Sequence, residues 1–171
     1  RYVQLSLAVA QRVRSDKALL RAYSLMRALH DADWSQMPGQ INKNLPKPNY
    51  DSVLYYLKKI EPLARRSSDP IELAMINHYL GYELRRRNDP KAIVYVEEKL
   101  QIFVKQKKLG DQVKALVDLA DTYIQFGQLQ RAKELLTKAE QLHRTLPTND
   151  QEVQAIFEGT YTHYYQAIGD W

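Results

Sequence analysis

The residues that could carry acid–base or metal chemistry are few and far apart. The chain has four histidines and no cysteine, which excludes thiolate metal sites, disulfides and cysteine nucleophiles. No two histidines have the i, i+4 spacing of a helical metal site. The cluster His30-Asp31-Ala32-Asp33 offers metal ligands, but a histidine near a helix C-terminus explains it better. We therefore predict no metal centre.

Catalytic motifs are also missing from the printed sequence. Glu97 and Glu98 are adjacent carboxylates, and neighbouring residues do not share a helix face. The sequence contains no nucleophile elbow, phosphate-binding loop or dinucleotide fingerprint. We therefore expect a protein that is not an enzyme and that uses no cofactor.

Basic side chains form short clusters, and the formal net charge is +5. The clusters are Lys58-Lys59, Arg65-Arg66, Arg85-Arg86-Arg87, and Lys105 with Lys107 and Lys108. They fall mostly near expected helix ends, where cations favour the helix dipole. The charge excess is modest and no recognition motif accompanies it. Nucleic-acid binding by a basic helical protein is thus the disfavoured alternative function.

The size and composition of the chain favour one globular helical domain. It has 171 residues, of which 44 % are apolar and 26 % charged, and only 6 are glycine. No stretch approaches the ~18 apolar residues that cross a bilayer, so we expect no membrane span. The chain begins at Arg1 without methionine and ends at Trp171 within an apparent motif. We interpret it as a fragment of a longer protein, organised as one continuous domain.

A unit of roughly 40 residues recurs along the chain. Asp69, Asp111 and Asp150 each follow a turn signal as candidate helix N-caps. The repeats predicted from them span about 69–109, 110–148 and, incompletely, 149–171. Apolar residues at helical spacing divide each complete repeat into two helices. Turns are expected at 88–90 and 126–128, and Gly110 is expected to end the helix that begins at Pro90.

Residues 1–67 have a looser pattern and are predicted to form helices around an inserted loop. Apolar residues at helical spacing indicate one helix from Ala18 to Leu29 and another from Val53 to Leu63. Either Asn49 or Asp51 could cap the second of these helices. Residues 1–14 also have helical spacing, either as a separate helix or joined to the next. The Pro- and Asn-rich stretch 32–49 is expected to be a long loop.

The best repeat resembles a tetratricopeptide (TPR) repeat. The matching residues are Leu116, Leu119, Ala120, Tyr123, Gly127, Leu129, Ala132, Leu136 and Ala139. Leu80-Gly81 resembles the Leu119-Ala120 pair, and Tyr165, Gly169 and Trp171 continue the pattern less completely. The long helices are similar to those of TPR regions in bacterial regulators and sensors. The resemblance implies an all-α solenoid of stacked antiparallel hairpins that form a right-handed superhelix.

The resemblance also implies a concave groove lined by the first helix of each repeat. The positions that it places there are His78, Tyr82, Arg85, Arg86, Lys114, Val117, Asp121, Gln125, Gly159, His163 and Gln166. Aromatic residues together with arginine and histidine suit a peptide or an anionic ligand, because guanidinium groups donate to carboxylates in pairs. An acidic protein or peptide is one such partner. About two-thirds of the tyrosines are expected to pack between helices, and Tyr82 and Tyr164 are the candidates for exposed contacts.

The function implied by the resemblance is binding of a protein or peptide without catalysis. The module is either a docking scaffold or the ligand-sensing region of a larger bacterial signalling protein. A periplasmic location is slightly favoured over a cytoplasmic one. The last repeat lacks a second helix, so its apolar stripe is expected to meet further chain or a second copy. Tyr161, Tyr165 and Trp171 are the residues expected to mediate that self-association.

Overall fold

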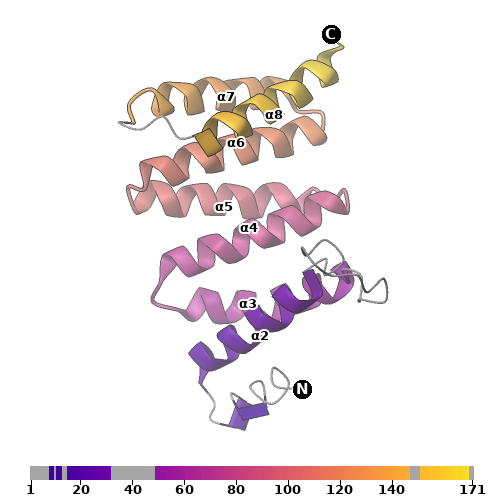
Figure 1. Ribbon diagram of the computed structural model, residues 1–171, viewed down its shortest axis with the longest axis vertical. Coiled ribbons are helices and arrows are strands. Elements are labelled where there is room, and N and C mark those ends of the chain that lie inside the picture. Colours follow the sequence, from indigo (N-terminus) through magenta and orange to yellow (C-terminus); the bar gives the residue numbers. More distant parts are fainter. Residues whose placement is uncertain (1–7, 10, 13–14, 32–48, 147–150, 170–171) are drawn as a thin grey trace, which may run out of the picture. The chain divides into compact units, whose positions relative to one another are not determined.

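The protein is all-helical throughout the part that its structure describes. The computed structural model describes residues 8–9, 11–12, 15–31, 49–146 and 151–169. Its labelled helices are α2 (Asp16–Asp31), α3 (Tyr50–Arg66), α4 (Pro70–Arg86), α5 (Lys91–Lys105), α6 (Leu109–Gln125), α7 (Leu129–His143) and α8 (Gln151–Ile168) (Figure 1). The described residues contain no strand, which confirms the all-α prediction. Residues 32–48 of the expected loop and most of residues 1–14 lie outside the described residues.

The chain divides into two compact units, which are described separately. The first comprises residues 1–76 and the second residues 77–171. The division falls inside α4, so this helix contributes residues 70–76 to the first unit and 77–86 to the second.

The first unit is built on the packing of α2 against α3. Leu57 and Ile60 of α3 are fully buried, and Leu20 and Ala22 of α2 are buried as well. Asn49 caps α3, because its side chain accepts a hydrogen bond from the backbone N–H of Ser52 at 3.0 Å. The structure thereby decides between the two caps that the sequence left open.

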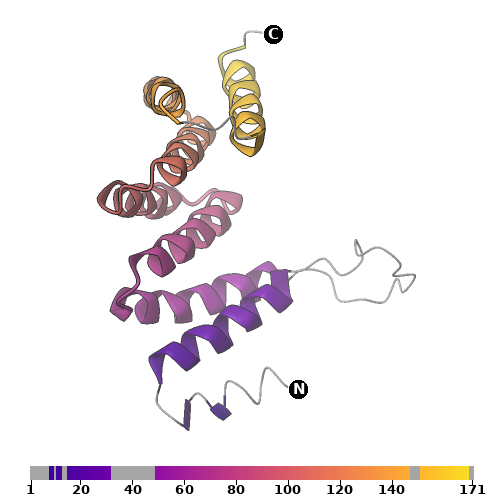
Figure 2. The same ribbon diagram turned by 60° about the vertical axis from the view of Figure 1, so that its left-hand side comes forward.

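The second unit has α6 at its centre, with α5, α7 and α8 packed around it. Its core is a cluster of apolar residues from these helices, among them Val96, Leu116, Ala120, Tyr123, Leu136, Ala139, Val153 and Phe157. The α8 helix packs more extensively on α6 than on α7, and Figure 2 shows α7 and α8 diverging. The incomplete contact between α7 and α8 leaves a hollow between them.

Between α4 and α7 the chain makes three turns, and two of them follow the predicted signals. Between α4 and α5, Asn88 is left-handed (φ 55°), and the carboxylate of Asp89 accepts from the Lys91 N–H at 2.9 Å. Between α6 and α7, Gly127 is left-handed (φ 71°). Both turns are therefore formed by residue types that favour a left-handed backbone or a helix cap, as the sequence predicted.

The third junction corrects two predictions. The α5 helix ends at Lys105, and the left-handed residue there is Lys107 (φ 54°). Gly110 is not a helix stop, because it lies in the first turn of α6. Asp111 is likewise not the N-cap: that position is Lys108, whose side chain makes no capping hydrogen bond. Asp111 instead places a negative charge in the first turn, which the helix dipole favours.

The two glycines of the α6 helix region should respond oppositely to alanine. Gly127→Ala puts a Cβ on a left-handed residue and is expected to cost about 1 kcal/mol of unfolding free energy. A Cβ at Gly110 meets no atom within 4 Å, and alanine there is expected to stabilise by about 0.5 kcal/mol. Urea unfolding of both variants measures these shifts. Stabilisation by Gly127→Ala would contradict the turn geometry.

Candidate functional site

One hollow of the second unit is lined by side chains of three helices. We call it the α4–α6–α8 hollow, and its volume is about 600 Å³. Its lining residues are Tyr82, Arg85 and Arg86 of α4, Asp121, Ile124 and Gln125 of α6, and His163, Gln166 and Ala167 of α8. The α5 and α7 helices, which alternate with these three, contribute no lining residue.

The three helices present their lining residues with the same spacing. In each helix the residues stand at i, i+3 and i+4, which is the spacing of one helix face. The sets 82/85/86, 121/124/125 and 163/166/167 are therefore spaced alike within their helices. They follow one another at intervals of roughly 40 residues, which is the length of the unit predicted from the sequence.

Arg85 is held against α6 by several hydrogen bonds. Its Nη1 donates to Asp121 Oδ2 at 2.7 Å and lies 3.3 Å from Asp118 Oδ1. Its backbone carbonyl accepts a hydrogen bond from Gln125 Nε2 at 2.7 Å. The guanidinium is thus neutralised by two carboxylates of the protein itself. It is less available to an anionic partner than the sequence suggested.

Asp118 is the centre of the charged side chains behind this hollow. Lys99 Nζ of α5 donates to Asp118 Oδ2 at 2.5 Å, and His78 Nδ1 lies 3.5 Å from the same oxygen. Burial alone would raise the pKa of Asp118. The hydrogen bond with His78 and the charges of Lys99 and Arg85 outweigh burial and hold the pKa well below its usual range. Asp118 therefore joins α4, α5 and α6 as a carboxylate.

His163 extends the same network to α8. Its Nδ1 lies 2.8 Å from Asp121 Oδ1, while the other oxygen of Asp121 accepts from Arg85. Asp121 thus bridges α4 and α8 from its central position on α6. We call the six residues His78, Arg85, Lys99, Asp118, Asp121 and His163 the charge network.

The rim of the hollow carries an exposed aromatic ring. Tyr82 is 45 % exposed, and the guanidinium carbons of Arg85 and Arg86 lie 6.0 and 5.7 Å from its ring centre. Glu83 is buried beside it and accepts from Arg87 at 2.7 Å and from Arg86 at 3.4 Å. The arginine cluster is therefore largely neutralised, and Tyr82 is the apolar surface that the rim presents.

The nine predicted binding residues occupy three kinds of position. Seven of them line the α4–α6–α8 hollow: Tyr82, Arg85, Arg86, Asp121, Gln125, His163 and Gln166. His78 belongs to the charge network behind it, and Lys114 is half-buried on α6 outside the lining. Of the further groove positions, Gly159 is exposed on α8. Val117 is fully buried, so its placement in the groove was wrong.

Sequence reasoning missed Asp118 and Lys99. Asp118 stands three residues before Asp121, so its position on the same helix face was readable from the spacing. Lys99 gave no such signal, because a lysine in an amphipathic helix is usually exposed. Here it is buried and paired with Asp118.

The aromatic residues of the last helix lie partly inward. Tyr161 packs against the core of the second unit, and its hydroxyl donates to Glu140 Oε1 at 2.6 Å. Tyr165 is exposed, whereas Tyr164, expected as an exposed contact, is half-buried against that core. Trp171 lies outside the described residues. A self-association surface here would therefore present Tyr165 more than Tyr161.

The described residues contain no group of three or more His, Asp or Glu side chains that could hold a metal ion. Among the helices that the structure describes, none is both long and apolar enough to cross a bilayer.

No protein-family model matches the chain, and no curated protein matches its sequence.

Proposed function

We propose that residues 77–171 form a TPR-like array of helical hairpins that binds a peptide segment of a partner protein without catalysis. The binding site is the α4–α6–α8 hollow. The observation that carries the proposal is the repeated i, i+3, i+4 lining from α4, α6 and α8, with none from α5 and α7. A solenoid that exposes the first helix of each hairpin on its inner face would present this pattern.

The packing of the α6–α7 hairpin supports the same proposal. Ala120 and Ala132 are fully buried, where the TPR resemblance requires small residues between two close helices. Tyr123 is buried as well, and Gly127 is left-handed in the turn. The burial and backbone conformation of these residues thus match the roles that the TPR resemblance implies. Because those roles depend on close helix packing, the match favours stacked hairpins over an unrelated bundle.

The chemistry of the hollow suits a peptide held by stacking and amide hydrogen bonds more than by charge. Tyr82 offers an exposed ring, and Gln125 and Gln166 offer side-chain amides to a peptide backbone. Arg85 and Asp121 neutralise each other, and Arg86 interacts with Glu83. The four basic side chains at 85, 86, 87 and 99 face three carboxylates at 83, 118 and 121, so the excess positive charge is small. An acidic partner is favoured only weakly.

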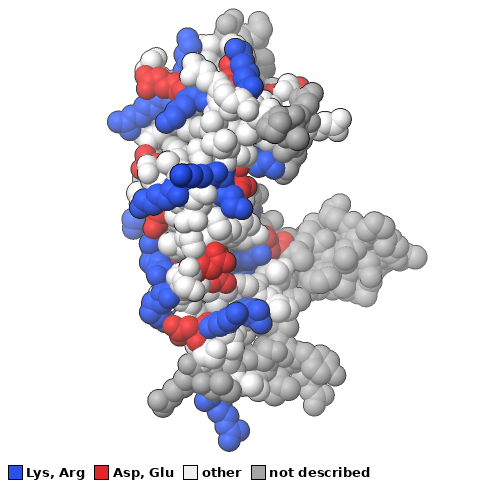
Figure 3. Space-filling model, turned by 90° about the vertical axis from the view of Figure 1, so that its left-hand side faces the viewer, with Lys and Arg blue, Asp and Glu red and all other residues white. Residues whose placement is uncertain are grey.

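The same pairing argues against nucleic acid as the partner. Nucleic-acid binding needs protein cations that contact phosphates and release the counterions of the nucleic acid. The run Arg85–Arg87 already has carboxylate partners in Glu83, Asp118 and Asp121. On the face drawn in Figure 3, basic side chains lie among acidic and uncharged ones. The described side chains drawn there form no continuous basic surface.

Selection from a random-peptide phage library provides the test. We expect peptides that bind the parent protein and lose about 30-fold in affinity to the Tyr82→Ala/Gln166→Ala variant, as for a central aromatic contact worth ~2 kcal/mol. Neither side chain belongs to the charge network, so the variant should keep its fold. Circular dichroism verifies this point.

The matched control is Tyr55→Ala/Gln141→Ala, which removes an exposed tyrosine and an exposed glutamine outside the hollow. It should bind the selected peptides as the parent does. Equal affinity of the peptides for the parent and for Tyr82→Ala/Gln166→Ala would refute the proposed site. A steep loss of binding with added salt, together with retention of single-stranded DNA, would favour nucleic acid instead.

A further inference from the structure

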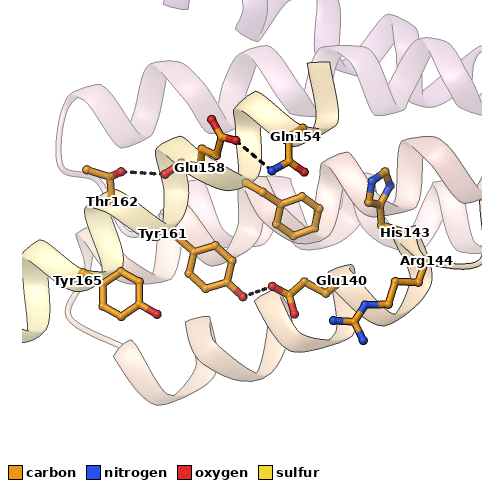
Figure 4. A pocket seen from close by; sticks show the side chains of 9 residues that line it. Glu140, His143, Arg144, Gln154, Glu158, Tyr161, Thr162 and Tyr165 are labelled. Carbon is orange, nitrogen blue, oxygen red and sulfur yellow. Dashed lines mark hydrogen bonds between the residues drawn. The ribbon is translucent and has the colours of Figure 1, made fainter. Parts of the chain in front are cut away.

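A second hollow of the same unit lies between α7 and α8 and shares no lining residue with the first. We call it the α7–α8 hollow, and its volume is about 600 Å³. Its lining residues are Glu140, His143 and Arg144 of α7, and Gln154, Phe157, Glu158, Tyr161, Thr162 and Tyr165 of α8 (Figure 4). It exists because α8 leans on α6 and makes few contacts with α7.

Aromatic rings form one wall of this hollow. Phe157, Tyr161 and Tyr165 follow each other at i, i+4 and i+8 on α8, with ring centres 6.5 and 6.1 Å apart. The ring planes are near-parallel, at 21° and 25°. Tyr165 is 47 % exposed at the open end of the row. The row therefore presents a π surface to anything that enters the hollow.

The carboxylates of this hollow have no basic partner in the described part of the chain. Glu140 is half-buried and accepts one hydrogen bond, from the Tyr161 hydroxyl at 2.6 Å. Glu158 accepts from Gln154 Nε2 at 3.0 Å. Arg144 lines the hollow but forms no ion pair with either glutamate among the described residues. The lining thus carries an excess of negative charge.

The half-buried carboxylates of the charge network, unlike Glu140, have basic partners within the protein. Asp118 and Asp121 each contact a basic side chain and a histidine. His143, by contrast, packs its ring 5.8 Å from Phe157, and its Nδ1 has no hydrogen-bond partner in the described part of the structure. It therefore forms no charge pair with Glu140. A half-buried carboxylate without a cation is costly, and a cation from outside would offset that cost.

We propose that the α7–α8 hollow binds the guanidinium group of an arginine side chain supplied by a partner peptide. A guanidinium is planar, stacks on aromatic faces and donates in pairs to a carboxylate. The hollow offers both features: Tyr161 is hydrogen-bonded to the carboxylate of Glu140, and the ring of Tyr165 follows that of Tyr161 in the same row. An ammonium group would use the charge but neither the stacking plane nor the paired donors. The site is separate from the α4–α6–α8 hollow and does not depend on its proposed function.

The hydroxyl of Tyr161 lies in an environment that favours its protonated form. Burial, the hydrogen bond to Glu140 and the charge of that carboxylate raise the pKa of the Tyr161 hydroxyl. The hydroxyl consequently remains a donor at neutral pH. It holds one oxygen of Glu140 in place, and both carboxylate oxygens keep a lone pair that can accept from a guanidinium.

The test is an NMR titration of the full chain that follows the ring signals of Tyr161 and Tyr165. The probes are the blocked peptide acetyl-Gly-Arg-Gly-amide, its lysine counterpart, ethylguanidinium chloride and neutral ethylurea. We expect saturable shifts with the arginine peptide, weaker binding of the lysine peptide and none of ethylurea. Ethylguanidinium should bind more weakly than the arginine peptide, which identifies a peptide as the source of the group.

Two variants test the charge argument in opposite directions. Glu140→Gln keeps an acceptor for the Tyr161 hydroxyl but removes the charge, and should weaken binding of the arginine peptide by at least ~10-fold. Arg144→Gln removes the competing cation and should strengthen it by about 3-fold. The matched control Glu134→Gln, an exposed residue of α7, should change nothing.

Failure of the arginine peptide to shift either tyrosine in the folded parent would overturn the proposal. So would equal binding to Glu140→Gln, or binding of ethylurea as strong as that of the arginine peptide. None of these results bears on Tyr82 or Gln166, so each of the two proposed sites is tested independently of the other.

Discussion

Replacing Asp118 with alanine is expected to lower the free energy of unfolding by about 3 kcal/mol at neutral pH, the low end of the range for breaking a buried ion pair. The loss arises chiefly at Lys99, whose side chain is 7 % exposed and whose charge would lose its carboxylate. Arg85 keeps Asp121, which limits the loss. Denaturant unfolding followed by circular dichroism measures the change.

The effect of Asp118→Ala should depend on pH. The folded-state pKa of Asp118 is depressed, so its carboxylate stabilises the fold fully above the unfolded-state pKa of about 4. That stabilisation is lost as the pH falls through and below this value toward the folded-state pKa. The difference between parent and variant should therefore be largest near pH 7 and shrink as the pH falls below about 4.

A paired replacement separates the loss of charge from the loss of packing. In Lys99→Met/Asp118→Leu both members of the pair become apolar, and no unpaired lysine is left. Replacing a buried pair by apolar residues is often neutral, so the double variant should recover more than half of the loss caused by Asp118→Ala. A loss below about 0.5 kcal/mol for Asp118→Ala, as for an exposed pair, would show that the charge network contributes little.

Local sequence signals predicted the helices well and failed where a turn lacked such a signal. Asn49, Asp89 and Gly127 each mark a helix end by their own backbone or capping chemistry. At the junction of α5 and α6, the left-handed conformation falls on Lys107 instead of the nearby Gly110. A lysine costs more than a glycine there, so tertiary packing of the two helices must impose the turn.

The candidate site was predictable to the extent that it depends on helix faces. The i, i+3, i+4 spacing places 82, 85 and 86 together without any knowledge of the neighbouring helices. Ion pairs between different helices could not be predicted in this way. Asp118 meets partners 19, 33 and 40 residues away, at Lys99, Arg85 and His78. Such pairs depend on how the helices stack, which a single sequence does not specify.

Gly81→Val is expected to destabilise the second unit by about 3 kcal/mol, the upper part of the range for overpacking a buried contact. Gly81 marks a close approach of α4 to α5: a Cβ built there would lie 2.7 Å from Val96 Cγ2 and 3.6 Å from the carbonyl oxygen of Ala92. Val96 is buried and β-branched, so it has few rotamers into which it could move. Thermal and denaturant unfolding both report the loss.

The neighbouring side chain provides the decisive control. Val96→Ala removes the methyl group that the new Cβ would meet, so Gly81→Val should cost clearly less in that background than in the parent. The expected coupling is about 1 kcal/mol or more, as for residues in direct contact. Gly81→Ala should have an unfolding free energy between those of the parent and of Gly81→Val, because its clash is partly offset by about 1 kcal/mol of helix propensity. If the effects of Gly81→Val and Val96→Ala are additive, the loss of stability arises in the backbone of α4. The close approach of α4 and α5 is then not what requires glycine at position 81.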